Sequence, residues 1–118
     1  MPETTIYREF ELLLAERRVP VLAFRTNAGK RIIESERGVR AIALLPAGFS
    51  DYLVLSAGGR ATFIEFKLGN AKQNAAQRRF ESSVVALGFE YRLHRSAVEA
   101  VNALTAALAD RASPSASP

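Results

Sequence analysis

Three residues in the middle of the chain have the types and spacing of a small hydrolytic site: Asp51, Glu65 and Lys67. Residues 60–68 have the composition of a β-strand, in which side chains two positions apart point to the same face. Glu65 and Lys67 therefore share a face. Two carboxylates held side by side repel each other and need a cation, and a lysine beside them could orient a water molecule or neutralise a developing charge. This combination is typical of metal-assisted phosphodiester hydrolysis.

The two acids are 14 positions apart in the sequence, so a hairpin must bring them together. A tight two-residue turn at Gly58 and Gly59 would place Asp51 and Glu65 on opposite faces. A three-residue loop over 57–59 would instead place them opposite each other on the same face. Such loops are common and require glycine in the left-handed region. We therefore predict the longer loop, or a β-bulge with the same effect.

A metal at such a site must be held by oxygen ligands. The chain contains no cysteine and one histidine, which excludes thiolate sites and argues against an imidazole cluster. Mg²⁺ or Mn²⁺ is the expected ion, because both accept carboxylate and carbonyl oxygens. The histidine, His94, is expected at the surface near a strand end. The alternative interpretation of the acids is a solvent-facing salt bridge with Lys67.

Helix and strand signals alternate along the chain. An apolar stripe of Ile6, Phe10, Leu13 and Leu14 predicts an N-terminal helix that ends before Pro20. Strand composition follows at 21–25, 38–45, 51–57, 60–68 and 89–93, a polar turn at 26–31, and helical patterns at 72–87 and 96–109. The predicted order is α-β-β-β-β-α-β-α, an α/β fold with a mixed central sheet flanked by helices.

The size and composition of the chain suit one small folded domain. We expect that domain to cover residues 1–111 and the tail at 112–118 to be disordered. Hydrophobic residues make up 48% of the 118 residues, enough for a packed core. No apolar run approaches the length of a membrane span, and the acidic, amphipathic N-terminus is unlike a secretory signal. We expect a cytoplasmic protein without a membrane partner.

The positive charge of the chain is concentrated in its middle. Residues 1–16 carry a net charge of −3, residues 17–79 carry +8, and residues 80–118 carry −1. Such a distribution is typical of a surface that contacts phosphates. A basic surface that serves only solubility is the other interpretation.

Five short motifs, taken in order, resemble the VRR-NUC family of the PD-(D/E)xK nucleases. They are Arg25-Thr26-Asn27-Ala28-Gly29, Gly48-Phe49-Ser50-Asp51, Glu65-Phe66-Lys67, Gln77 and Leu87-Gly88-Phe89. The resemblance covers roughly residues 3–104 and implies a restriction-endonuclease-like core. One departure is Ser50, where the family usually has proline, which would pre-set the turn.

The resemblance implies a role for each residue of the central motifs. Asp51 and Glu65 would bind the metal, with the backbone carbonyl of Phe66 as a third ligand. Lys67 would position or activate the attacking water. Gln77 would support the site through a hydrogen bond to Lys67, to water or to phosphate.

Other candidate residues lie on the first helix and on polar segments. The family has a glutamate on this helix, and Glu3, near the centre of the apolar stripe, fits better than Glu9 at its edge. Either could also be an exposed helical glutamate. The candidates for contacts with the DNA backbone are Asn27, Lys30, Arg31, Lys72 and Arg78. An ordinary turn and a solvated helix face explain these residues equally well.

The function implied by the resemblance is a Mg²⁺- or Mn²⁺-dependent, structure-selective DNA endonuclease. Stand-alone phage and bacterial members resemble Holliday-junction resolvases, so branched DNA is the expected substrate and a homodimer the expected assembly. A phage-encoded chain would act in the bacterial host cytoplasm. The alternatives are a nuclease subunit of a restriction or packaging complex that needs a partner, and a non-catalytic nucleic-acid-binding module.

Overall fold

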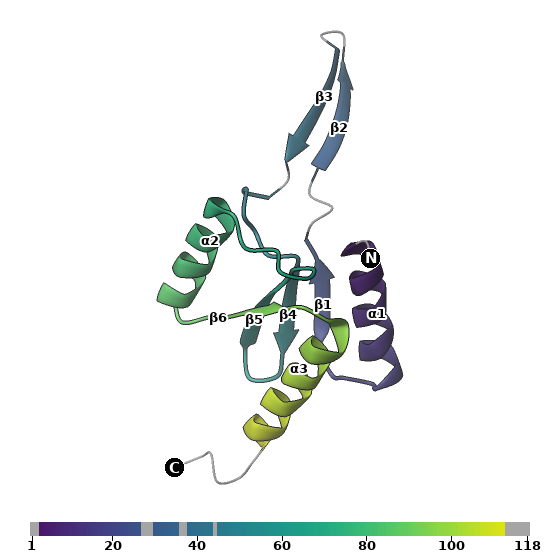
Figure 1. Ribbon diagram of the computed structural model, residues 1–118, viewed down its shortest axis with the longest axis vertical. Helices are drawn as coiled ribbons and strands as arrows, with labels where there is room; N and C mark the ends of the chain where they lie inside the picture. The colour runs from purple at the N-terminus through teal and green to yellow at the C-terminus, as the bar shows by residue number, and fades with distance from the viewer. Residues whose placement is uncertain (1–2, 27–29, 36–37, 44, 113–118) are drawn as a thin grey trace. The chain divides into compact units, whose positions relative to one another are not determined.

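The computed structural model describes residues 3–26, 30–35, 38–43 and 45–112 (Figure 1). The elements are α1 (Glu3–Glu16), β1 (Leu22–Arg25), β2 (Lys30–Ser35), β3 (Gly38–Ala43), β4 (Tyr52–Ser56), β5 (Arg60–Phe66), α2 (Ala75–Ala86), β6 (Glu90–His94) and α3 (Ala97–Ala112). Because α3 includes residue 112, the remainder of the expected tail lies outside the described residues.

Two sheets form instead of the single sheet that was predicted. The main sheet has the order β1-β4-β5-β6, with β1–β4 and β4–β5 antiparallel, and is mixed overall. Among the described residues, β2 and β3 form a separate two-stranded antiparallel sheet. The predicted order was therefore wrong by one strand, because Lys30 and Arg31, expected in the turn at 26–31, begin β2. The α/β class with a mixed sheet and helices is confirmed for the described residues.

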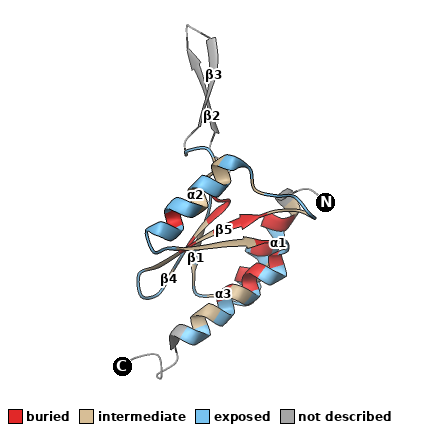
Figure 2. Ribbon diagram, turned by 60° about the vertical axis from the view of Figure 1, so that its left-hand side comes forward, coloured by how far each residue is buried: buried red, intermediate tan, exposed pale blue. Residues whose placement is uncertain are grey.

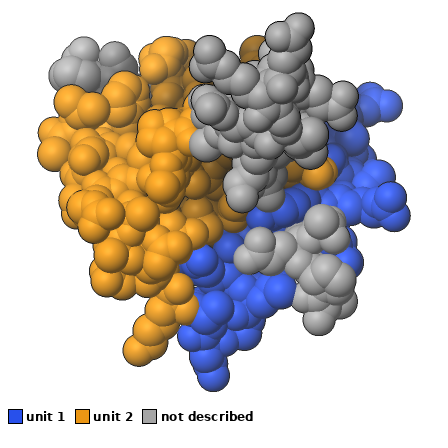
Figure 3. Space-filling model, turned by 90° about the horizontal axis from the view of Figure 1, so that it is seen from above, with its two compact units in different colours: residues 1–20, 66–71, 93–118 blue, residues 21–65, 72–92 orange. Residues whose placement is uncertain are grey.

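Contacts within the chain define two compact units (Figure 3). The first unit comprises residues 1–20, 66–71 and 93–118, and the second comprises residues 21–65 and 72–92. The expectation of one domain over 1–111 stays a prediction. Among the described residues, no helix is long and apolar enough to cross a membrane.

The first unit is built around the apolar stripe of α1. Ile6, Phe10 and Leu14 are buried as the spacing predicts, and Tyr7 is buried beside them. Phe66, at the end of β5, is fully buried, with its ring 5.3 Å from that of Phe10 and 6.1 Å from that of Tyr7. Burying a phenylalanine side chain stabilises a fold by about 2–3 kcal/mol. This packing fixes the chain directly after Glu65.

The second unit holds a cluster of aromatic rings between α2 and the sheet. Phe80 of α2 packs against Phe49 at 4.6 Å, Phe63 at 5.5 Å and Tyr91 at 6.3 Å between ring centroids. The buried residues of this unit also run along β4 and β5 (Figure 2). Edge-to-face ring pairs add to the free energy of burial. The cluster holds α2 against β5, which carries Glu65, and against the loop that leads to Asp51.

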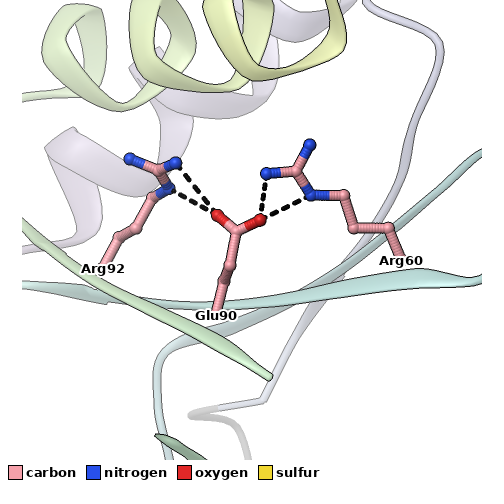
Figure 4. A network of polar contacts seen from close by, with 3 residues as sticks. All are labelled: Arg60, Glu90 and Arg92. Atoms are coloured by element: carbon pink, nitrogen blue, oxygen red, sulfur yellow. Dashed lines mark hydrogen bonds and ion pairs between the residues drawn. The ribbon is translucent and has the colours of Figure 1, made fainter. Parts of the chain in front are cut away.

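An ionic network joins β5 to β6 in the same unit (Figure 4). The Glu90 carboxylate accepts hydrogen bonds from Arg60 Nε at 2.6 Å and from Arg92 Nη2 at 2.9 Å. Burial by itself raises the pKa of Glu90, but the hydrogen bonds and charges of Arg60 and Arg92 outweigh it and lower that pKa below its ordinary value. Glu90 therefore stays ionised at neutral pH and links two strands of the sheet.

Candidate functional site

The register of the β4–β5 hairpin brings the two acids together. Ser56 pairs with Arg60 and Tyr52 with Ile64, so the loop has three residues, 57–59. Both of its glycines have positive φ, 82° for Gly58 and 72° for Gly59. Continuing the register by one position places Asp51 opposite Glu65 on the same face. The prediction of a three-residue loop is confirmed.

Both acids are buried. Asp51 is 7% exposed and Glu65 is 2% exposed, although Glu65 alternates along β5 with the fully buried Ile64 and Phe66. The strand therefore buries residues on both of its faces. These carboxylates are therefore not solvent-facing. Two buried like charges in facing positions require a positive or hydrogen-bonding environment.

Hydrogen bonds hold the turn that delivers Asp51. The Ser50 hydroxyl, fully buried, donates to the Tyr52 carbonyl at 3.0 Å. The Thr26 amide donates to the Asp51 carbonyl at 2.8 Å, and its hydroxyl donates to the Ser50 carbonyl. These contacts fix the backbone around Ser50.

Gly48 lets the same turn approach α2. Its φ is +86°, and a Cβ placed on it would lie 2.3 Å from the Ala76 carbonyl oxygen. No side chain fits that space, because the nearest atoms belong to the backbone of α2. Gly48 therefore allows the loop before Asp51 to pack directly on the first turn of the helix that carries Gln77.

Gln77 links the start of α2 to Glu65. Its backbone amide donates to Asn74 Oδ1 and its Oε1 accepts from the Asn74 amide, both at 2.9 Å, which forms a capping box. Since Oε1 is used in this way, the Nε2 group is the free end of the amide. Nε2 donates to Glu65 Oε2 at 3.2 Å. The structure thus brings Gln77 to Glu65, which is not one of the partners expected from the sequence.

The remaining members of the predicted site belong to the first unit. Lys67 is half-buried, and its backbone amide donates to the His94 carbonyl at 3.1 Å. Glu9 is exposed, and the side chain of Glu3, at the start of α1, lies outside what the structure describes. His94 is only 7% exposed, and its Nδ1 lies 2.8 Å from Glu99 Oε1, so the prediction of a surface histidine was wrong.

Of the residues predicted to contact DNA, Lys72 and Arg78 are the two whose side chains the structure describes. Asn27 and the side chains of Lys30 and Arg31 fall outside the described residues. Lys72 and Arg78 are both exposed, and Arg78 Nη1 donates to the Gln73 carbonyl at 2.7 Å. Arg78 thus also supports the loop that leads into α2.

Sequence reasoning missed an amide–hydroxyl pair, Gln73 and Tyr91, in the second unit. Gln73 Nε2 donates to the Tyr91 hydroxyl at 3.0 Å, which ties the loop before α2 to β6. Burial is the main cause that raises the pKa of the Tyr91 phenol; the Gln73 hydrogen bond lowers it, and the charges of Glu65, Glu81 and Asp51 raise it further. The field of both candidate acids therefore reaches the Tyr91 hydroxyl. No local motif marks these two residues.

The donor set fits a hard divalent cation. Among the described residues, no group of three or more His, Cys, Asp or Glu side chains could hold a metal. Asp51 and Glu65 would therefore supply two carboxylates, and backbone carbonyl, water or phosphate oxygens would supply the rest. Mg²⁺ commonly binds proteins in this way, through one or two carboxylates together with substrate phosphates.

Comparison with known proteins returned no match to any family model, curated protein or solved structure. The resemblance to VRR-NUC nucleases therefore rests on the sequence motifs. The buried, facing carboxylates of Asp51 and Glu65 are a separate observation, made on the structure alone.

Proposed function

We propose that the chain is a metal-dependent phosphodiester hydrolase. The observation that carries this proposal is the burial of Asp51 and Glu65 in facing positions at one end of the β4–β5 hairpin. Burying two carboxylates costs free energy unless hydrogen bonds or cations compensate. Gln77 donates one hydrogen bond to Glu65, and a divalent cation bound by both carboxylates would add positive charge at the same place.

Each residue has a distinct role in this proposal. Asp51 and Glu65 would hold the cation, with the Phe66 carbonyl as a third protein ligand. When bound, the cation would supply positive charge that favours attack of water on the phosphodiester. Lys67, two residues after Glu65, would orient that water or neutralise charge that develops on the phosphate. Gln77 would keep Glu65 in one orientation.

Within this class, we propose a DNA endonuclease of the VRR-NUC type that cuts branched DNA such as a four-way junction. The support is the ordered set of motifs and the basic excess of residues 17–79. Symmetrical cutting of two strands by a chain with one such site requires two copies, so the proposed form is a homodimer.

The test is cleavage of labelled four-way junction, flap, duplex and single-stranded DNA by the purified chain. Reactions would contain Mg²⁺, Mn²⁺ or EDTA, with the variants Asp51→Asn, Glu65→Gln and Lys67→Ala. We expect paired nicks in the junction with either metal, none with EDTA, and a loss of at least about 100-fold in each variant. Asp110→Asn, which alters an exposed acid of α3, is the matched control and should retain full activity.

Other outcomes separate the alternatives. Cutting of flaps or duplex DNA would keep the hydrolase and reject the resolvase. Binding without cutting in every metal would reject catalysis by the isolated chain and leave a partner-dependent subunit or a binding module. Size-exclusion chromatography with light scattering would test the homodimer on the same sample.

A further inference from the structure

Two contacts hold the side chain of Tyr91 on β6, the strand next to β5 in the main sheet. Gln73 Nε2 donates to the Tyr91 hydroxyl oxygen at 3.0 Å. The Tyr91 ring lies 6.3 Å from that of Phe80. Behind Gln73, the Arg78 guanidinium donates to the Gln73 carbonyl at 2.7 Å. Ring and hydroxyl are therefore both fixed before any ligand binds.

The Tyr91 hydroxyl can still donate a hydrogen bond to a ligand. Within the described residues, the Tyr91 hydroxyl donates to no acceptor. Burial and the charges of Glu65, Glu81 and Asp51 raise the pKa of the phenol, so the group keeps its proton at neutral pH. A fixed O–H donor of this kind binds an anionic oxygen.

We propose that Tyr91 is a further substrate-positioning residue, whose hydroxyl donates to a non-bridging oxygen of the bound phosphodiester while Gln73 sets its direction. This inference rests on the proposed function, because the phosphodiester is the anionic ligand that the reaction brings to Asp51 and Glu65. A phosphate held by the hydroxyl and by the cation at the acids would be oriented from two directions. Tyr91 would act on binding and on rate.

The deciding variant is Tyr91→Phe, which removes the hydroxyl and keeps the ring. We expect unchanged thermal stability, about 10- to 100-fold slower single-turnover cleavage, and about 10-fold weaker binding of the same DNA in EDTA. Gln73→Ala should lower the same two quantities by a smaller factor. The double variant should match Tyr91→Phe, because Gln73 acts through the hydroxyl.

Thr105→Val is the control, since it removes a hydroxyl that donates to the Val101 carbonyl within α3 at 2.9 Å. It should change neither cleavage nor binding. If the wild-type chain cleaves DNA and Tyr91→Phe equals it in rate and affinity, the role of Tyr91 is rejected and the hydrolase stands. If nothing is cleaved but Tyr91→Phe binds more weakly in EDTA, the phosphate contact stands and the hydrolase is rejected. Absence of both binding and cleavage would reject both.

Discussion

At the scale of single residues, Gln77 both caps helix α2 and donates a hydrogen bond to a candidate metal ligand. Its Oε1 and its backbone amide complete the cap of α2, and its Nε2 donates to the buried Glu65. The cap decides which end of the amide faces the acid, because the Asn74 amide can only donate to Oε1. The direction of the Glu65 hydrogen bond therefore follows from the start of a helix.

This dual role makes Gln77→Glu informative. Glutamate at the third helical position also completes a capping box, so α2 should form normally. The new carboxylate would lie where Nε2 now donates to Glu65, and the repulsion should cost about 2 kcal/mol of unfolding free energy and most of the cleavage activity at neutral pH. Urea unfolding by circular dichroism measures the first quantity.

Asn74→Ala separates the two roles of Gln77. It removes the cap and should cost about 1 kcal/mol while leaving the Gln77–Glu65 contact able to form. If wild type and Gln77→Glu are equally stable and equally active, the contact between Gln77 and Glu65 contributes neither to stability nor to cleavage.

The candidate acids could be predicted from the sequence, but their supporting residues were harder to find. Acids and a lysine at fixed strand spacing leave a local pattern. Asn74 and Gln77 form an N-x-x-Q sequence at the start of α2, which could have predicted the capping box. Tyr91 and Gln73 meet only through the tertiary fold, so no spacing rule finds them. His94 was misplaced because its burial depends on packing in the first unit.

At the scale of elements, the contact between the Gly48 loop and α2 couples Asp51 to Gln77. Gly48 and Gly59 both have positive φ, but only Gly48 lacks space for a Cβ. The two glycines therefore form a matched pair for separating backbone strain from close approach.

We expect Gly59→Ala to cost about 1 kcal/mol, the strain of a left-handed alanine, with cleavage unchanged. Gly48→Ala should cost on the order of 3 kcal/mol, because the loop or α2 must also move. Cleavage should then fall, since the displacement separates Asp51 from Gln77. Thermal unfolding and initial cleavage rates of both variants provide the measurement, and similar values for the two would contradict the close approach.

The β4–β5 loop could be predicted from the sequence, whereas strand β2 could not, and each outcome has a physical reason. The two adjacent glycines signal a loop, and burial of both acids on one face requires the three-residue form. β2 was missed because charged residues flank its single apolar pair and an Asn-Ala-Gly turn signal precedes it. Whether a strand joins the main sheet or pairs only with a neighbour depends on long-range contacts that composition does not encode.

At the scale of the whole molecule, charge governs how the chain would meet a polyanion. The excess of +8 over residues 17–79 outweighs the −3 and −1 of the flanking segments. Contacts between lysine or arginine and DNA phosphates release counterions. The affinity should therefore fall as salt is added, with log Kd rising linearly with the logarithm of the salt concentration.

Lys72→Ala and Arg79→Ala, at exposed positions near Gln77, should each reduce the magnitude of the salt slope by about one. The control is Arg8→Ala, an exposed arginine in the acidic N-terminal segment, which should leave the slope unchanged. Fluorescence anisotropy with labelled DNA in EDTA gives the slope. A uniform effect of all three substitutions would indicate attraction by net charge without a defined DNA-binding face.

The hairpin loop has a consequence for how this sequence can diverge. Residues 57–59 lie roughly 17 Å along the strands from the acids, in the kind of surface loop where insertions and deletions are ordinarily tolerated. Side chains of a strand alternate between two faces of the sheet. A shift of register by one residue would therefore turn Asp51 to the face opposite Glu65, with no intermediate arrangement. A change of loop length that shifts the register by one residue is therefore equivalent to a mutation of the site, and descendants that keep both acids facing each other must avoid it.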